Sequence, residues 1–298
     1  MPIHAHHGTD DVIDLAEFLR IADAADVNTT DGMLAITEPF AMLGNNRSFL
    51  SDFFCDYIKA NVATDPLASV VAQSVVLSRN ERYYIRANMW LPEEEVTENE
   101  AILFAYNQAH DHNFDLLSLA YCGDGYVTDC YEYNYDDVAG YVGEAVELTP
   151  LGSVKHGCGD TLLYIANKDI HFQRAPSTPS VTLNVIPLAN QNGTRDQYFF
   201  DIEGPDSTVG TISGYPTTII EQRRMLFDIA KHFADDAVAR LLAGIAEAHP
   251  CRRTRYESLR ALKTCNPEAH GQVCRQLRDD KEPLIRAYLR SIEKEMAH

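Results

Sequence analysis

The spacing of apolar residues divides the chain into three parts, and the first part is helical. In residues 10–26, apolar side chains recur as on one face of an α-helix: Val12, Ile13, Leu15, Leu19 and Ile21. Asp10 and Asp11 stand near the expected start of this helix, where acidic side chains are favourable. Residues 45–61 repeat the pattern. The sequence therefore predicts a helical N-terminal segment over residues 1–74.

Residues 75–215 show the pattern of β-strands. Two strand-like runs flank a turn at residues 79–80, and further runs are separated by Gly-rich turns at 123–125, 157–159 and 192–193. Many short strands with regular turns are typical of an antiparallel sandwich or barrel. We therefore expect a mainly β fold with flanking α-helices.

The helical period returns at residue 216 and continues to the end of the chain. The last predicted helix has a clear apolar face beside its basic residues: Leu284, Ile285, Tyr288, Leu289 and Ile292. Pro250 and Pro283, 33 residues apart, each precede an Arg-bearing amphipathic helix. These two imperfect copies resemble a HEAT-like repeat. Residues 216–298 are thus predicted to form a helical C-terminal subdomain.

The charge of the chain argues against polyanionic partners. The formal net charge is −19, whereas nucleic acids and anionic membranes bind basic surfaces. The charge is uneven, since residues 251–298 hold 11 Lys and Arg against 7 Asp and Glu. This mildly basic tail can dock on the acidic body or meet an acidic partner. No apolar run reaches the roughly 18 residues of a membrane span, so no membrane association is expected.

The start of the chain and its cysteines predict a cytoplasmic protein. The first residues, MPIHAHHGTDD, lack the basic and apolar regions of a signal peptide. Seven scattered cysteines without a CxxC pair fit a reducing compartment and mostly inert thiols. We assign no role to the terminal histidines His4, His6 and His7, because chain ends are usually disordered.

Two histidines, His110 and His112, stand one residue apart in a stretch with the strand pattern. Alternate residues of a strand share a face and lie about 7 Å apart, so both imidazoles can converge on one metal ion. Buried ring nitrogens need partners, which either a metal ion or backbone carbonyls supply. From this pair alone, a metal site and two hydrogen-bonded core histidines remain equally open.

A third histidine, His171, completes a spacing that resembles the cupin family. The first cupin motif begins H-x-H and ends in Gly, matched by residues 110–112 and Gly123. The second motif runs from G-D through an apolar strand to His, matched by residues 159–160 and His171. The resemblance covers roughly residues 80–200. It implies a cupin (jelly-roll) β-barrel over the strand region and a metal ion held by the three histidines.

The sequence departs from the common cupin pattern at the fourth ligand. Leu116 or Leu117 stands where a Glu is usual, and the nearby Asp115 has the wrong strand parity. A neutral three-His site resembles the thiol dioxygenase branch, in which Fe(II) keeps positions open for substrate and dioxygen. The Ser-His-Tyr set of that branch falls at Thr182, Asn184 and Ile186, so a cysteine-type substrate is not expected.

A second resemblance involves the strand before the first motif. Arg86-x-x-x-Trp90 followed by H-D-H-x-[FW]-D at residues 110–115 is similar to a group of uncharacterised cupins. It implies the fold and the metal site, and no substrate. Asp111 and Asp115 are candidates to orient the ligand histidines by accepting an N–H.

Three further residues are candidates for catalysis. Arg86 can clamp a substrate carboxylate, with a salt bridge at the rim as the alternative. Among the tyrosines on the predicted strands, Tyr164 is the candidate for hydrogen bonding to the substrate, although tyrosine is also an ordinary strand residue. His156 is the fourth choice for a ligand or acid/base, and its Gly-rich turn favours a surface position.

Together these observations predict a non-haem Fe(II)-dependent oxygenase acting on a small molecule that coordinates the iron. Zinc, nickel or copper also suit imidazole ligands. The expected partners are the small-molecule substrate and dioxygen, and a homodimer is an open option. Two alternatives remain: a metal-dependent isomerase or lyase at the same site, or a non-catalytic ligand-binding cupin with a protein-docking helical tail.

Overall fold

The computed structural model describes most of the chain: residues 1–60, 73–97, 104–188, 193–216, 218–233 and 235–296. These residues form two compact units. The first unit comprises Met1–Glu132 and Thr149–Ala189, and the second comprises Tyr133–Leu148 and Asn190–His298.

A six-stranded antiparallel sheet forms one wall of the first unit. Its order is β1–β9–β5–β11–β3–β2. The strands are β1 (Ile3–His6), β2 (Ser74–Arg79), β3 (Tyr83–Trp90), β5 (Leu116–Cys122), β9 (Asp160–Tyr164) and β11 (Ser180–Pro187). The predicted turn at residues 79–80 is confirmed, because β2 and β3 pair on either side of it.

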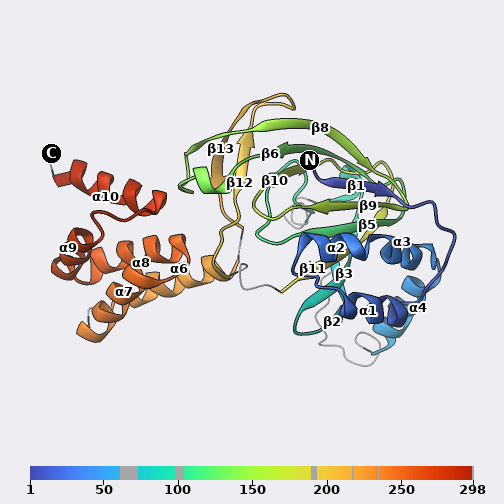
Figure 1. The fold of residues 1–298 in the computed structure, drawn as a ribbon, viewed down its shortest axis with the longest axis horizontal. Helices are drawn as coiled ribbons and strands as arrows, with labels where there is room; N and C mark the ends of the chain where they lie inside the picture. Colours follow the sequence, from blue (N-terminus) through green and yellow to red (C-terminus); the bar gives the residue numbers. More distant parts are fainter. Residues whose placement is uncertain (61–72, 98–103, 189–192, 217, 234, 297–298) are drawn as a thin grey trace. The chain divides into compact units, whose positions relative to one another are not determined.

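Four strands of a second sheet form the facing wall of this unit, in the order β4–β10–β6–β8. They are β4 (Ala109–His110), β6 (Tyr126–Glu132), β8 (Thr149–His156) and β10 (Asp169–Gln173). Side chains from the two walls meet inside: Ser118 Oγ lies 3.0 Å from His156 Nε2, and the Tyr164 and His171 rings are 4.3 Å apart. The predicted class, a jelly-roll β-barrel with flanking helices, is confirmed (Figure 1).

In the described part of the N-terminal segment, four α-helices cover the outer face of the six-stranded sheet (Figure 1). They are α1 (Leu15–Ala24), α2 (Thr30–Ala35), α3 (Thr37–Asn45) and α4 (Phe49–Ile58). Phe18 and Phe40 from the helices pack with Leu117 and Leu183 from the sheet in one buried core. Every second residue of β5 therefore faces the helices, while the residues between face the barrel interior.

Helix α1 begins at Leu15, later than the positions of Asp10 and Asp11 predicted. Asp14 caps it by accepting a hydrogen bond from the Glu17 N–H at 2.8 Å. Such a cap satisfies a backbone donor that the first helical turn leaves without a partner. The expectation of a start near Asp10 and Asp11 is wrong, because the cap fixes the start at Leu15.

The described residues of the second unit form three strands and five α-helices. The strands pair in the order β7 (Ala145–Glu147), β13 (Val209–Gly214), β12 (Phe199–Ile202), and the helices are α6 (Ile219–Ala230), α7 (Asp236–Ala248), α8 (Arg252–Cys265), α9 (Pro267–Gln276) and α10 (Pro283–Met296). The predicted apolar face of the last helix packs into the helical core through Ile285 and Tyr288. The boundaries predicted at residues 74 and 215 separate helical segments of the sequence from the strand segment. The compact units are divided differently, because the second unit includes strands as well as helices.

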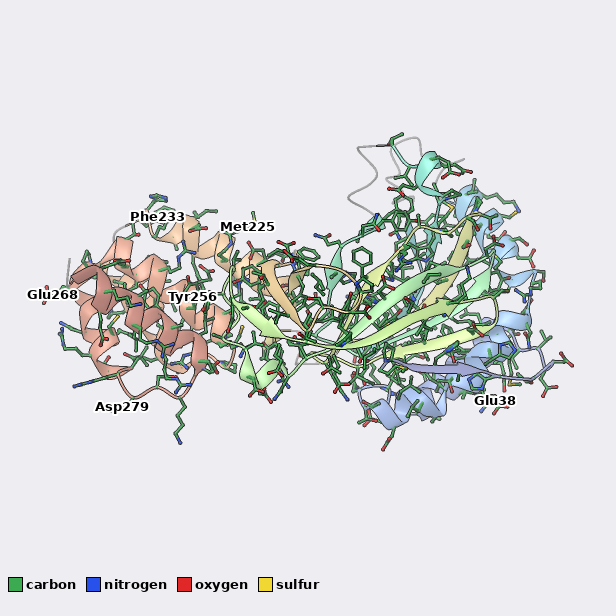
Figure 2. All side chains as sticks on the ribbon, turned by 90° about the horizontal axis from the view of Figure 1, so that it is seen from above. Glu38, Met225, Phe233, Tyr256, Glu268 and Asp279 are labelled. Atoms are coloured by element: carbon green, nitrogen blue, oxygen red, sulfur yellow. The ribbon has the colours of Figure 1, made fainter. Side chains whose placement is uncertain are left out.

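Helix α6 and the turn after it carry exposed apolar side chains, including Met225, Leu226, Ile229 and Phe233. Figure 2 labels Met225 and Phe233. Among the helices of the described ranges, none is both long and apolar enough to span a bilayer.

Candidate metal centre

The stretch that holds His110 and His112 is not a single strand. β4 ends at His110, and β5 begins at Leu116 in the facing sheet. The prediction that both histidines occupy alternate positions of one strand is therefore wrong. His112 lies in the crossover between the two sheets. The strand-like alternation of residues continues there in the sequence, although the strand itself has ended.

The structure nevertheless brings the three predicted ligands together. His110 on β4 and His171 on β10 are direct partners across an antiparallel pair, with their Nε2 atoms 2.9 Å apart. The His112 ring centroid lies 5.1 Å from that of His110 and 5.0 Å from that of His171. One ligand nitrogen from each histidine lies within 4.8 Å of the other two. This separation lets all three imidazoles reach one ion.

The loop that follows β9 holds the backbone of His112 in place. The Asn167 N–H donates to the His112 carbonyl at 2.6 Å, and Asn167 adopts a positive φ of 53°. Asp115 anchors the same loop by accepting from the Ala166 N–H at 2.8 Å and from the Thr30 hydroxyl at 2.7 Å. Asp115 points out of the barrel, as its strand parity predicts; it is buried between this loop and helix α2, and it supports His112 through the backbone.

The first ligand has a defined tautomer. His110 Nδ1 lies 2.9 Å from the Gln108 carbonyl, which can only accept, so Nδ1 carries the proton. His110 Nε2 therefore presents a lone pair to the centre of the group, and His171 Nε2 donates to it when no metal is bound. Metal ligation requires the His171 proton to move to Nδ1, which is buried without a hydrogen-bond partner among the described residues.

Burial keeps all three imidazoles neutral. Desolvation lowers the pKa of His110, and it lowers the pKa values of His112 and His171 well below their usual range. The neighbouring histidines add to this effect at His112 and His171, because each would repel a second positive charge. Neutral imidazole is the form that binds metal ions, so the donor set fits iron, zinc, copper or nickel.

No carboxylate belongs to the group among the described residues. The two leucines at the expected Glu position face opposite sides of the sheet. Leu116 packs in the barrel interior, and Leu117 packs in the core beneath the helices. The donors available in this part of the chain are therefore the three imidazoles.

Arg86 lies on β3, directly opposite Asn184 of β11. Its positive charge contributes to the lowered pKa of His112, which places it near the metal ligands. The predicted alternative, a rim salt bridge, is not seen among the described residues, and Arg86 Nε is buried without a partner. Asn88 and Asn184 each leave a buried side-chain oxygen without a partner beside it. These two asparagines were not predicted as site residues from the sequence. Asn88 could have been, because it lies two residues after Arg86 and therefore faces the same side of the strand.

Tyr164 packs against a ligand. Its ring centroid lies 4.3 Å from that of His171, and its buried hydroxyl lies near Thr128 and Tyr126. Burial, with a further contribution from the neighbouring Tyr126, raises the pKa of Tyr164 well above its usual value. The phenol is therefore protonated and can donate a hydrogen bond.

His156 is not a surface residue, and this expectation is wrong. It is fully buried as the last residue of β8, before the turn begins at Gly157. Its Nε2 lies 3.0 Å from Ser118 Oγ, and its ring lies 5.3 Å from that of Tyr126. Burial lowers its pKa to about 3. The three-His group does not include His156.

Comparisons with known proteins add little to this geometry. No family model and no curated protein matches the chain. A cupin domain from Bordetella pertussis is similar over 39% of this chain and 92% of its own, with 16% identity and a TM-score of 0.24. A structure of prolyl 4-hydroxylases from Phytophthora capsici is similar over 94% and 81%, with 11% identity and a TM-score of 0.18. At these identities and TM-scores neither structure identifies the fold, which the two facing antiparallel sheets define as a jelly-roll barrel.

The terminal histidines belong to an ordered strand of this barrel. β1 pairs with β9, and His4 and His6 contact the Asp160 carboxylate at 3.3 Å and 2.8 Å. His7 Nε2 lies 3.3 Å from Thr161 Oγ1. The expectation of a disordered start is wrong, because residues 3–6 complete the edge of the sheet.

Proposed function

We propose that the protein is a non-haem Fe(II)-dependent oxygenase that acts on a small carboxylate-bearing molecule. The observation that carries the proposal is the group of three neutral imidazoles, converging from β4, the crossover and β10. His110, His112 and His171 would hold the ion. Three protein ligands leave coordination positions open, and ferrous iron supplies the redox chemistry with dioxygen.

Arg86 supports the carboxylate as the recognised group. Among the described residues the largely buried guanidinium of Arg86 has no carboxylate partner, which is unfavourable because burial removes its water and no acidic side chain in this part of the structure pairs with its charge. A substrate carboxylate would supply the missing counter-charge through two parallel hydrogen bonds. The Asn88 and Asn184 oxygens would accept from a neighbouring hydroxyl or amine of the same molecule.

Tyr164 would donate its phenolic hydrogen to a substrate oxygen next to His171. Its raised pKa keeps that proton in place at neutral pH. Arg86 and Tyr164 thus orient the substrate from two strands of the same sheet, which fixes the reacting carbon relative to the three ligands.

The first experiment measures metal in the purified full-length chain after anaerobic Fe(II) loading. We expect one iron per chain in the wild type, and almost none in His110→Ala. His232→Ala is the matched control, because His232 is exposed and outside the group, and it should retain iron. Equal iron in all three proteins would overturn the metal site.

The second experiment measures oxygen uptake by the iron-loaded chain against a panel of small carboxylates. Stoichiometric uptake with one of them supports an oxygenase. Conversion of a carboxylate without oxygen uptake would replace it by the metal-dependent isomerase or lyase. Arg86→Met should retain iron and raise KM for the carboxylate at least tenfold, since it removes the counter-charge and leaves the ligands intact.

A further inference from the structure

Two cysteines lie near each other where β5 ends and β9 begins, and neither belongs to the three-His group. Cys122 ends β5 and is half-buried, and Cys158 lies exposed in the turn between β8 and β9. The β5–β9 ladder runs from Leu116 opposite Tyr164 to Leu119 opposite Thr161. A hydrogen bond from the Gly159 N–H to the Ala120 carbonyl, at 2.8 Å, carries the pairing on toward the cysteines.

The sulfur of Cys158 lies close to the backbone of Cys122. Cys158 Sγ donates to the Tyr121 carbonyl oxygen at 3.3 Å, and Tyr121 directly precedes Cys122. In a trans peptide this oxygen lies about 2.8 Å from the next Cα, so the sulfur lies within about 6 Å of the Cys122 Cα. A disulfide spans Cα atoms about 4.4–6.8 Å apart, so the position of the Cys158 sulfur beside the Cys122 backbone is compatible with a link between the two residues.

Arg47 distinguishes Cys158 from the other exposed thiol. Its Nη1 lies 3.4 Å from Cys158 Sγ and also donates to the Tyr121 carbonyl. The guanidinium therefore places a positive charge and a hydrogen-bond donor beside this sulfur and beside the anion that leaves when the sulfur reacts. Cys55 is also exposed, but no such contact with an arginine is seen for it in the described structure.

Cys122 has the properties of the second thiol of a pair. Burial raises its pKa, and the proximity of Cys158 raises it further. It therefore remains a protonated thiol beside the more exposed Cys158. The turn that holds Cys158 can adjust, because Gly157 and Gly159 flank Cys158 and Gly159 adopts a φ of +89°.

We propose that Cys158 and Cys122 form a reversible disulfide when the protein meets a peroxide. The Cys158 thiolate attacks hydrogen peroxide, so that an S–O bond forms, the O–O bond breaks and hydroxide leaves. Cys122 sulfur then attacks the resulting sulfenic acid; the S–S bond forms, the S–O bond breaks, and the thiol proton leaves with the hydroxyl as water. Two thiols lose two electrons and the peroxide becomes two waters. A dithiol reductant reverses the change by exchange.

The test treats the reduced full-length chain with hydrogen peroxide, with a chelator present to suppress reactions of free iron. Peptide mapping by mass spectrometry should find a Cys122–Cys158 disulfide that dithiothreitol removes. Cys122→Ser should leave Cys158 as a sulfenic acid that dimedone traps, and Cys158→Ser should abolish both products. Oxidation of Cys158 without this linkage in the wild type would overturn the proposal.

Arg47 provides the second measurement. Arg47→Gln should slow alkylation of Cys158 by at least threefold, and Arg47→Lys should restore most of the rate. Cys55 in the same protein is the internal control, and its alkylation rate should not change. If Cys158 reacts no faster than Cys55 in the wild type, the assigned role of Arg47 is wrong.

Discussion

His156 lies in the barrel interior with no exposed surface and contacts Ser118. Its pKa, lowered to about 3 by burial, is well below the value of about 6.5 expected in the unfolded chain. Between these two values the unfolded chain binds a proton that the folded chain does not bind. The free energy of unfolding therefore falls as the pH is lowered from about 6.5 toward 3.

His156→Gln should remove this part of the pH dependence while retaining a partner for Ser118. Between pH 7 and pH 5, the free energy of unfolding of the wild type should fall by about 2 kcal/mol more than that of the variant. Urea unfolding at the two pH values measures the difference. His232→Gln, which changes an exposed histidine, should behave as the wild type. Parallel curves for the wild type and His156→Gln would show that His156 is not held neutral.

At the scale of elements, the β6–β8 pair depends on a close approach at Gly125. Gly125 has a φ of +66°, and a Cβ built on it would lie 1.8 Å from the His156 carbonyl oxygen. That oxygen is backbone, so it cannot move without displacing the end of β8. Gly152 in the same sheet has a φ of +84° and open space around it. Alanine substitutions at the two glycines therefore separate the destabilisation due to the positive φ, which both share, from that due to the close contact, which only Gly125 has.

Gly125→Ala should destabilise the protein by at least about 2 kcal/mol more than Gly152→Ala does. The positive φ alone costs about 1–2 kcal/mol for alanine, and this term is common to both variants. Guanidinium unfolding at neutral pH measures the difference. Equal losses would mean that β8 moves away from residue 125 at little cost.

The sequence predicts the elements better than it predicts the connections between them. The helical stripe of 45–61 and the turn at 79–80 depend on neighbouring residues, and both predictions hold. The crossover at residues 111–115 could not be predicted from neighbouring residues, because its alternating pattern fits a continuous strand equally well. The burial of His156 depends on strands distant in the sequence that close over it. The meeting of His110 with His171 was inferred from motif spacing, and only the β4–β10 pairing gives it a geometry.

At the scale of the whole molecule, the candidate ligands all belong to the first compact unit. His110, His112 and His171 lie within Met1–Glu132 and Thr149–Ala189. The helices α7 and α8 belong to the second unit and have a core of their own. An ion that binds only the folded first unit stabilises that unit directly.

Metal loading should therefore slow hydrogen exchange in β4 and β10 and leave exchange in α7 and α8 unchanged. At a free metal concentration about 100 times Kd, the expected stabilisation is about 2.7 kcal/mol. Hydrogen exchange followed by mass spectrometry, with and without Zn²⁺ as a redox-inert probe, measures both units in one sample. Equal protection in all four elements would show that the two units unfold together.

The pairing of His110 with His171 also has a consequence for how the protein folds. The two residues are 61 positions apart, and the segment between them contains β5, β6, β8 and β9. Contacts that close so long a loop lose much chain entropy and form after more local ones. In zinc fingers, by contrast, the metal itself drives a short chain to fold. Here most of the barrel must be assembled before the ligands meet, so the metal centre is a late product of folding and the apoprotein has to reach its native topology unaided.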